Sequence, residues 1–484
     1  MRTIGTPSTQ ARKLNAIASG ALPNGDPVVV NSDGTVSAVS GGAVSESVGS
    51  PVAYEADSVF YGAAAYDASS QKVVIAYRDV NNSNRGTAIV GTVSGTSISF
   101  GTPVVFYSGS NNYNAITYDA NSQKVVIAFT DVSNGSRGLA IVGAISGTSI
   151  SFGSSALFNS NQSTIISMTY HAVAQKVVIA YRNSGTSTGS AIVGTVSGTS
   201  ISFGSSASFS TYNVDETSIT YDAANEKVII GYRESIYPTY PTYIVAGTVS
   251  GTSLSFGTPA LVHSGATSYI AVGYDADAQK VIASYADSGN SYYGTAVVGT
   301  VSGTSISLGS PTVYTSSRVM SQAAVYHPDA KKTIIAYQDF TNSNYGKVTS
   351  ATISGTSLSF TTPVTFYSGF ASVHPSTYDA NSQKVVIAYR DNSNSGYGTA
   401  VTYAPAYTFT NITSENFIGT AQTGAADGNR AVVNIKGSID ENQSGLTAGQ
   451  SYYVQTDGTL GTTPADPSVF AGTAISATKM IVKG

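Results

Sequence analysis

Short runs of apolar, β-branched residues alternate with polar turns along most of the chain. The clearest unit begins at Tyr378, which ends a weak strand pattern, and continues through the turn sequence Asp-Ala-Asn-Ser into the apolar run of residues 384–389. A short β-branched run bounded by turn residues predicts a buried strand. In the first copy, residues 86–93 predict a third strand. Residues 98–106 predict a fourth, which follows a Ser-Gly-Thr-Ser hairpin turn and carries a proline at its bulge or edge.

This unit recurs with nearly constant spacing. Its opening tyrosine stands at Tyr66, Tyr118, Tyr170, Tyr221, Tyr274, Tyr326 and Tyr378. Successive copies are 52, 52, 51, 53, 52 and 52 residues apart. Four antiparallel strands in about 50 residues are typical of one blade of a β-propeller. No segment has the 3.6-residue period of a helical repeat, and a parallel β-helix needs shorter repeats. The sequence therefore predicts an all-β, seven-bladed β-propeller.

The N-terminal part of the chain contains the strand that the last copy lacks. Ser-Gly-Thr-Ser occurs in each of the first six copies and is absent after residues 401–403 in the seventh. Residues 47–54 instead match residues 99–106, an outer-strand segment of the first copy. We therefore expect the N-terminal strand to pair with the last blade and close the ring, which protects strand edges that would otherwise be exposed.

The remaining segments predict a second, smaller β-domain. Residues 1–44 contain a polar arm and a hairpin pattern, residues 45–409 hold the propeller, and residues 410–484 are expected to form a small β-barrel or sandwich for attachment. Its candidate strands are 416–422, 430–436, 451–456, 469–474 and 479–483. The N-terminal hairpin returns here, because Leu22, Gly25, Val30, Asp33, Gly34 and Thr35 match Leu446, Gly449, Val454, Asp457, Gly458 and Thr459 in the same register. The ends of a closed ring meet, so residues 1–44 can join this module.

Composition narrows the function classes. Charged residues make up 10% of the chain, against about 25% in ordinary soluble proteins, and the formal net charge is −4. This gives no basic surface for nucleic acid, and no run approaches the ~18 apolar residues of a membrane span. The chain has no cysteine, which excludes disulfides and thiol catalysis, and we expect no cofactor. Residues 1–8 lack the apolar core of a secretory signal. That combination favours a virion protein released by lysis, with a trimmed chain or signal-independent export as alternatives.

The candidate binding face carries the longer, variable loops. In a propeller, the loops between second and third strands and the segments between blades share one face. Here these segments differ between copies: 79–86, 234–243, 287–294, 108–115, 159–167 and 210–218. Tyrosines on this face are Tyr61, Tyr113, Tyr212, Tyr237, Tyr240, Tyr292, Tyr293, Tyr345 and Tyr397, and equivalent positions in four copies hold Arg78, Arg182, Arg233 and Arg390. Tyrosine suits sugar rings and protein epitopes, and arginine suits anions. Packing between blades and hydrogen bonds to loop carbonyls are the structural alternatives.

Two chemical alternatives are weaker. Loops such as the one after Asp79 offer one carboxylate, whereas Ca²⁺ takes six to eight oxygen ligands, so we expect Asx-type turns and no metal site. The four histidines do not cluster: His171 and His327 replace the aspartate that follows the repeat tyrosine, whereas His263 and His374 fall in loops between blades. No Ser/His/Asp arrangement is apparent. A sialidase-like site would combine the arginines and tyrosines with Asp57, Asp215 and Glu216. We expect no enzymatic activity.

Two parts of the chain resemble proteins of tailed phages. The run Ser-Gly-Leu-Thr-Ala-Gly-Gln-Ser-Tyr-Tyr-Val-Gln-Thr-Asp-Gly-Thr-Leu at residues 444–460, with Ala-Ile-Ser-Ala-Thr-Lys at residues 474–479, is similar to the C-terminal module of tail-fibre and related virion proteins. The Tyr-Asp-Ala and Gln-Lys-Val-Val-Ile-Ala-Tyr repeats resemble those of marine phage virion proteins. The resemblance implies a non-enzymatic structural or adhesive protein on the virion surface, as a tail fibre or capsid appendage, and it carries over no catalytic residues.

The resemblance also implies partners. The β-module or the N-terminal arm would bind other virion proteins, and the variable face would bind glycan or protein on the host surface. A homo-oligomer is compatible with this arrangement. The sequence leaves two alternatives open, a bacterial or secreted propeller lectin and a sialidase-like glycan-processing enzyme.

Overall fold

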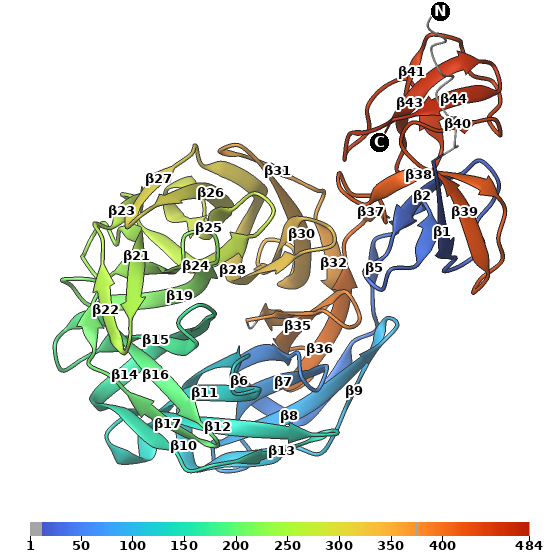
Figure 1. The fold of residues 1–484 in the computed structure, drawn as a ribbon. Coiled ribbons are helices and arrows are strands. Elements are labelled where there is room, and N and C mark those ends of the chain that lie inside the picture. The colour runs from blue at the N-terminus through green and yellow to red at the C-terminus, as the bar shows by residue number, and fades with distance from the viewer. Residues whose placement is uncertain (1–11, 374, 484) are drawn as a thin grey trace, which may run out of the picture. The chain divides into compact units, whose positions relative to one another are not determined.

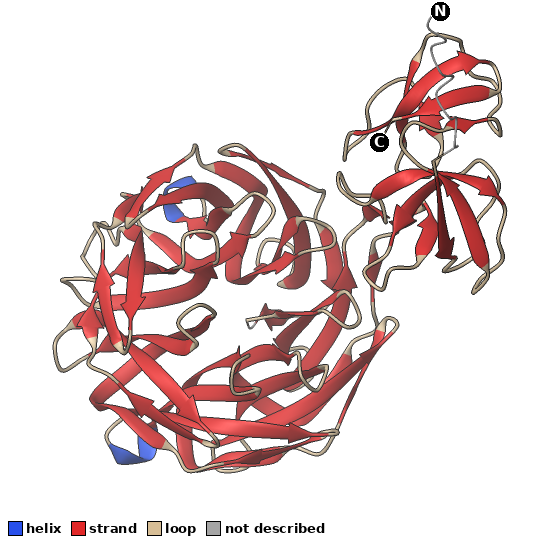
Figure 2. Ribbon diagram, viewed as in Figure 1, coloured by secondary structure: helices blue, strands red, loops and turns tan. Residues whose placement is uncertain are grey.

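The computed structural model describes residues 12–373 and 375–483 (Figure 1). Residues 1–11, where we expected part of a polar arm, and His374 lie outside the described residues. The fold is all-β, and the only helical turns among the described residues are two 3₁₀ segments, η1 (Val132–Asn134) and η2 (Ser288–Asn290) (Figure 2). No helix in this part of the chain is long and apolar enough to cross a membrane. The chain divides into two compact units, Glu46–Pro405 and the combination of Met1–Ser45 with Ala406–Gly484.

The larger unit repeats one antiparallel strand order. The innermost strands are β6 (Val52–Asp67), β10 (Val104–Asp119), β14 (Ala156–His171), β19 (Val214–Asp222), β24 (Thr267–Asp275), β28 (Thr312–His327), and the pair β33 (Ala371–Val373) and β34 (Thr377–Asp379). The second strands are β7 (Lys72–Asp79), β11 (Lys124–Asp131), β15 (Lys176–Asn183), β20 (Lys227–Glu234), β25 (Lys280–Asp287), β29 (Lys332–Asp339) and β35 (Lys384–Asp391). The third strands are β8 (Arg85–Ser94), β12 (Arg137–Ser146), β16 (Thr188–Ser197), β21 (Thr242–Ser250), β26 (Tyr293–Ser302), β30 (Tyr345–Ser354) and β36 (Tyr397–Ala404).

The outer edge of each sheet is assembled from short pieces. After the Ser-Gly-Thr-Ser turns come β9 (Ser97–Phe100), β13 (Ser149–Phe152), β17 (Ser200–Phe203), β22 (Ser253–Phe256), β27 (Ser305–Leu308) and β31 (Ser357–Phe360). Three later repeats add β18 (Ala207–Ser208), β23 (Ala260–His263) and β32 (Val364–Tyr367). Figure 1 shows these sheets standing around a common axis with their innermost strands toward it, which is a propeller-like arrangement. The core lies between the faces of neighbouring repeats, where residues such as Val74 of one repeat pack with Ile127 of the next.

Two of the predicted inter-blade loops are wrong, because residues 108–115 and 159–167 lie inside the continuous strands β10 and β14. In β10 the pairing passes directly from one repeat to the next: Ser110 faces Arg85 of β8, and Asn111 faces Asp131 of β11. A positive φ of 50° at Tyr113 accompanies the register shift at this point. The polar composition of these segments thus reflects strands that change partners. The predicted single fourth strand is likewise two pieces, both paired with the third strand of the same sheet.

A contact between a glycine and an aromatic ring is repeated in most sheets of the larger unit. In the first repeat, a Cβ added to Gly86 of β8 would lie 2.5 Å from the ring of Phe106. Phe106 also packs against Phe129 of the next repeat, with ring centroids 5.3 Å apart. The same contact between two aromatic rings occurs in five other places: Tyr54–Tyr77, Phe158–Tyr181, Phe209–Tyr232, Tyr314–Tyr337 and Phe366–Tyr389. Glycine is needed here because any side chain would displace the aromatic ring that couples one sheet to the next.

The last repeat pairs with a segment from the start of the larger unit. Strand β36 is antiparallel to β5 (Ser47–Val48), with Val48 opposite Tyr403, and to the first part of β6, with Ala53 opposite Thr399. The hydroxyl of Tyr403, a fully buried side chain, donates a 2.7 Å hydrogen bond to Oε1 of Glu46. Sequence-distant segments therefore share one sheet.

The smaller unit contains two sheets with the same spatial order. The first is β1 (Lys13–Ile17), β39 (Arg430–Asn434), β38 (Phe417–Thr423), β2 (Pro27–Val30) and β3 (Val36–Ala38). The second is β40 (Ile439–Asp440), β44 (Lys479–Val482), β43 (Val469–Ser476), β41 (Ser451–Val454) and β42 (Leu460–Gly461). In both, a strand pair of the predicted hairpin type turns at an Asp-Gly sequence whose glycine, Gly34 or Gly458, has positive φ. The smaller unit is thus a duplicated five-stranded module.

The first copy of that module is interrupted by the larger unit. Its first three strands precede residue 46 and its last two follow residue 405, whereas the second copy is continuous. A two-stranded ribbon of β4 (Gly41–Val44) and β37 (Tyr407–Thr410) joins the ends of the interruption, with Val44 opposite Tyr407. The propeller-like unit is therefore inserted between the third and fourth strands of one module.

Candidate functional site

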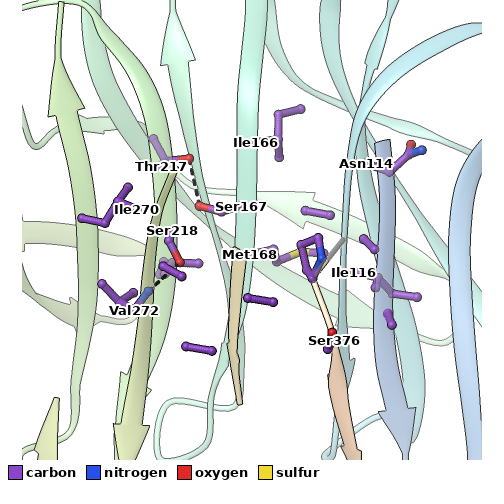
Figure 3. Close-up of a pocket in the computed structure, with 18 of the residues that line it drawn as sticks. Asn114, Ile116, Ile166, Ser167, Met168, Thr217, Ser218, Ile270, Val272 and Ser376 are labelled. Atoms are coloured by element: carbon purple, nitrogen blue, oxygen red, sulfur yellow. Dashed lines mark hydrogen bonds between the residues drawn. The ribbon is translucent and has the colours of Figure 1, made fainter. Parts of the chain in front are cut away.

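The innermost strands surround a cavity of about 330 Å³ on the axis of the larger unit. The residue three positions before each repeat tyrosine lines it, namely Ala63, Ala115, Ser167, Ser218, Ala271, Ala323 and Pro375. Figure 3 shows the larger neighbours Ile116, Met168 and Val272 pointing into the same region. No charged side chain lines this cavity among the described residues. Small and apolar side chains allow the inner strands to approach the axis closely.

Polar side chains link neighbouring innermost strands around this cavity. Oγ1 of Thr217 donates a 2.7 Å hydrogen bond to the carbonyl of Ile165, and Nδ2 of Asn114 donates one of 3.1 Å to the carbonyl of Tyr61. The backbone amide of Val272 donates to Oγ of Ser218 at 3.0 Å (Figure 3). Each bond joins one repeat to the next, so these contacts hold the inner strands in fixed register.

Aromatic rings of the innermost strands β6 and β10 stack with guanidinium groups of the second strands β7 and β35. The Arg78 guanidinium carbon lies 4.9 Å from the centroid of the Phe60 ring and 5.0 Å from that of Tyr61. The Arg390 guanidinium carbon lies 4.4 Å from the same Phe60 ring. The Tyr61 ring in turn lies 4.7 Å from that of Tyr113.

Arg182 extends the cluster. Arg182 of β15 lies opposite Thr164 of β14, as Arg78 lies opposite Phe60 in the first repeat. Burial and the neighbouring Tyr61 raise the pKa of Tyr113, and the positive charge of Arg182 acts in the opposite direction. Burial lowers the pKa of the Arg390 guanidinium. We call the set Phe60, Tyr61, Arg78, Tyr113, Arg182 and Arg390 the arginine–aromatic cluster.

Sequence reasoning found five members of this cluster and missed Phe60. Phe60 is 37% exposed, and the equivalent position in other copies holds polar residues such as Asn112, Thr164 and Ser268. An apolar ring at a position that is otherwise mostly polar is the signal that would have found it. The structure also adds Arg318, whose guanidinium carbon lies 4.6 Å from the ring centroid of Tyr292 and 4.7 Å from that of Phe340.

Arg233 occupies an equivalent position but is held by acids. Its Nε lies 2.8 Å from Oδ1 of Asp215, and its Nη1 lies 3.4 Å from Oε1 of Glu216. Burial alone would lower the pKa of Arg233, but the hydrogen bond to Asp215 and the charge of Glu216 outweigh it and raise that pKa. Burial raises the pKa of Glu216 against the opposing effect of Arg233, and Oε2 of Glu216 accepts from the amide of Ile270 at 2.9 Å. This guanidinium is neutralised within the protein.

The remaining tyrosine candidates separate into two groups. Tyr237 is 82% exposed, and its ring meets that of Tyr240 edge to face at 6.2 Å. Tyr212 is 55% exposed. The other three, Tyr293, Tyr345 and Tyr397, are the first residues of the third strands β26, β30 and β36. In the described part of the chain, no stacked-ring or cation–ring contact joins these three to the arginine–aromatic cluster.

The loop aspartates form Asx-type turns. Oδ1 of Asp391 accepts from the amides of Ser393 and Asn394 at 3.0 and 3.2 Å, and Oδ1 of Asp79 accepts from the amide of Asn82 at 3.1 Å. The third candidate acid, Asp57, accepts a 2.5 Å hydrogen bond from Nδ2 of Asn81. Among the described residues, no group of three histidine or acidic side chains is placed to hold a metal ion.

Comparison with known proteins finds structures that share only a general likeness. A chain of the mitotic checkpoint complex has 9% identity and a TM-score of 0.49, over 75% of this chain and 95% of its own. A protein of unknown function from Dyadobacter fermentans has 10% identity and a TM-score of 0.45, over 75% and 98%. Sqt1 from Chaetomium thermophilum has 11% identity and a TM-score of 0.45, over 75% and 100%. No family model and no curated protein matches the chain. The propeller-like assignment therefore rests on the strand pairings.

Proposed function

We propose that this protein is a non-enzymatic adhesion protein of a phage virion, a tail fibre or capsid appendage, which binds glycan on the host surface. The observation that carries the proposal is the arginine–aromatic cluster. Partly exposed aromatic rings beside guanidinium donors suit carbohydrate binding. The aromatic ring can stack on a sugar ring while the donors bind the oxygens of the sugar. The phage-like repeats and C-terminal run support the virion setting.

The proposed display platform is a seven-bladed propeller closed by the N-terminal strand. Seven evenly spaced tyrosines support the blade count. The pairing of β36 with β5 and β6 supports closure. Closure would leave no open sheet edge in the ring, which suits a particle exposed to shear and proteases. In this proposal the smaller unit attaches the protein to other virion proteins.

The binding part of the proposal is tested with the full chain, labelled fluorescently and applied to an array of neutral and acidic microbial glycans. The test variant is Phe60→Ala, which removes the ring between two guanidinium groups. We expect retention on the glycans that the unchanged protein binds to fall roughly thirtyfold, as for loss of an aromatic anchor worth about 2 kcal/mol. The control is Phe409→Ala, which removes another exposed phenylalanine, in the smaller unit. The proposed site would be contradicted if Phe60→Ala bound these glycans as well as the control Phe409→Ala does.

The virion part is tested by the genes that flank this one. Neighbours that encode capsid, portal or tail proteins are the expected result. A neighbourhood of secretion or carbohydrate-uptake genes would overturn the virion setting and favour a bacterial lectin, without affecting the binding proposal.

A further inference from the structure

The arginine–aromatic cluster holds positive charge that the protein itself does not neutralise. No carboxylate among the described residues lies within ion-pair distance of Arg78, Arg182 or Arg390, whereas Arg233 and Arg137 are paired with acids at 2.8 and 3.1 Å. A guanidinium is charged at all relevant pH values. Three partly buried, uncompensated charges in a chain of net charge −4 are therefore a local feature of this surface rather than a consequence of composition.

The hydrogen-bonding capacity of these arginines is also largely unused. Arg78 donates through Nη1 to Oδ1 of Asn112 at 2.6 Å, and Arg390 donates through Nη2 to Oγ of Ser58 at 3.2 Å. The Nε atoms of Arg78, Arg182 and Arg390 are buried without a partner among the described residues. Each guanidinium carries five N–H donors, so several donors on the terminal nitrogens remain for a ligand.

The stacked rings determine which edges of these groups a ligand meets. Phe60 contacts a guanidinium group from each of two repeats, and Tyr61 contacts Arg78. A guanidinium whose face lies on a ring presents its planar N–H edge, and that edge matches the two oxygens of a carboxylate or the oxygens of a sulfate. The exposed part of Phe60 and the half-buried Tyr61 and Tyr113 offer apolar surface beside these donors.

We propose that the arginine–aromatic cluster binds an acidic polysaccharide, with sugar rings on Phe60, Tyr61 and Tyr113 and anionic groups on Arg78, Arg182 and Arg390. This inference rests on the proposed glycan-binding function and specifies the class of glycan. A protein surface with balanced charge would not select such a polymer over a neutral one. Here an anion stabilises the desolvated guanidinium groups more strongly than the hydroxyl groups of a neutral sugar do.

The test uses the full chain and three polymers, alginate as a polycarboxylate, dextran sulfate as a polysulfate and dextran as a neutral polymer. Binding is measured by biolayer interferometry at increasing salt. We expect at least one charged polymer to bind tenfold or more tightly than dextran, with affinity that falls as salt rises, and the tighter of the two identifies the preferred anionic group. Equal binding of dextran would overturn the acidic class and leave glycan binding intact. If no polymer binds, this inference is overturned, while the glycan array still decides the proposed function.

Variants separate a built site from general charge. Arg78→Gln/Arg390→Gln is expected to weaken binding of the charged polymer at least tenfold, and Arg78→Lys/Arg390→Lys to weaken it less than that but measurably, because lysine keeps charge and loses the planar edge. Arg430→Gln, at an exposed position in the smaller unit, removes one charge as a control and is expected to bind as the unchanged protein does. Circular dichroism verifies that each variant folds. If the glutamine pair binds like the control, the cluster is not the site.

Discussion

Replacing Tyr54 with alanine tests whether the N-terminal strand holds the last repeat. Tyr54 lies in the part of β6 that pairs with β36, is 4% exposed, and packs with ring centroids 5.2 Å from Tyr77 and 5.8 Å from Phe100. A buried aromatic side chain covers about 150–250 Å², worth about 4 to 6 kcal/mol at about 25 cal/mol per Å². Truncations of buried aromatics cost about 3 to 5 kcal/mol. We expect the free energy of unfolding of the larger unit to fall by about 3 to 5 kcal/mol.

The hydroxyl of Tyr54 supplies a matched control. It is buried without a hydrogen-bond partner among the described residues, and the equivalent ring in several other repeats is phenylalanine. A buried unsatisfied polar group costs about 1 to 3 kcal/mol, so Tyr54→Phe is expected to leave stability unchanged or raise it. Phe158→Ala, an equivalent ring inside the array, is expected to cost as much as Tyr54→Ala.

Urea unfolding followed by circular dichroism measures both effects as shifts in the midpoint of the larger unit's transition. Tyr54→Ala would change stability by less than about 0.5 kcal/mol if its ring were at a solvent-exposed surface. That result, together with a normal loss for Phe158→Ala, would refute the reasoning that the N-terminal strand completes the last sheet.

Three further outcomes are expected. Burial lowers the pKa of His171 and His327 below 6.5 in the folded protein. As pH falls, these histidines therefore bind protons in the unfolded protein before they do so in the folded one. The stability that their neutral rings confer is then present above pH 6.5 and lost as pH falls, and His171→Asp/His327→Asp should flatten the fall in melting temperature between pH 6.5 and 5. Gly86→Ala should lower stability by about 1 to 3 kcal/mol in urea unfolding, because the added methyl meets Phe106. Replacing Glu46–Pro405 with a tight turn should leave the smaller unit folded, because β4 and β37 already pair as two antiparallel strands that a turn can join. Circular dichroism would show its β-structure, and size-exclusion chromatography would show a compact monomer.

Local rules were enough to predict most strands and turns. The run of residues 384–389 is strand, and the Ser-Gly-Thr-Ser turns and the Asp-Gly turn at Gly34 fall where composition placed them. These signals are local, since β-branched runs and turn residues act on their own backbone. The segment of residues 108–115 was misread because its polar residues pair with two different strands in succession, and no local pattern distinguishes that from a loop.

The sequence by itself determined the repeat, its strands and the positions at which tyrosine and arginine recur, because periodic spacing and short-range composition specify these directly. Tertiary structure alone decided which of those side chains meet. It brought Arg390 onto the ring of Phe60, although 330 positions separate them. It also gave Arg233 two acids, whereas no acid in the described part of the chain forms an ion pair with its counterparts Arg78, Arg182 and Arg390. The physical reason is that contacts across neighbouring repeats depend on how the sheets pack around the axis, and that packing is fixed by buried rings and small residues distributed over the whole unit.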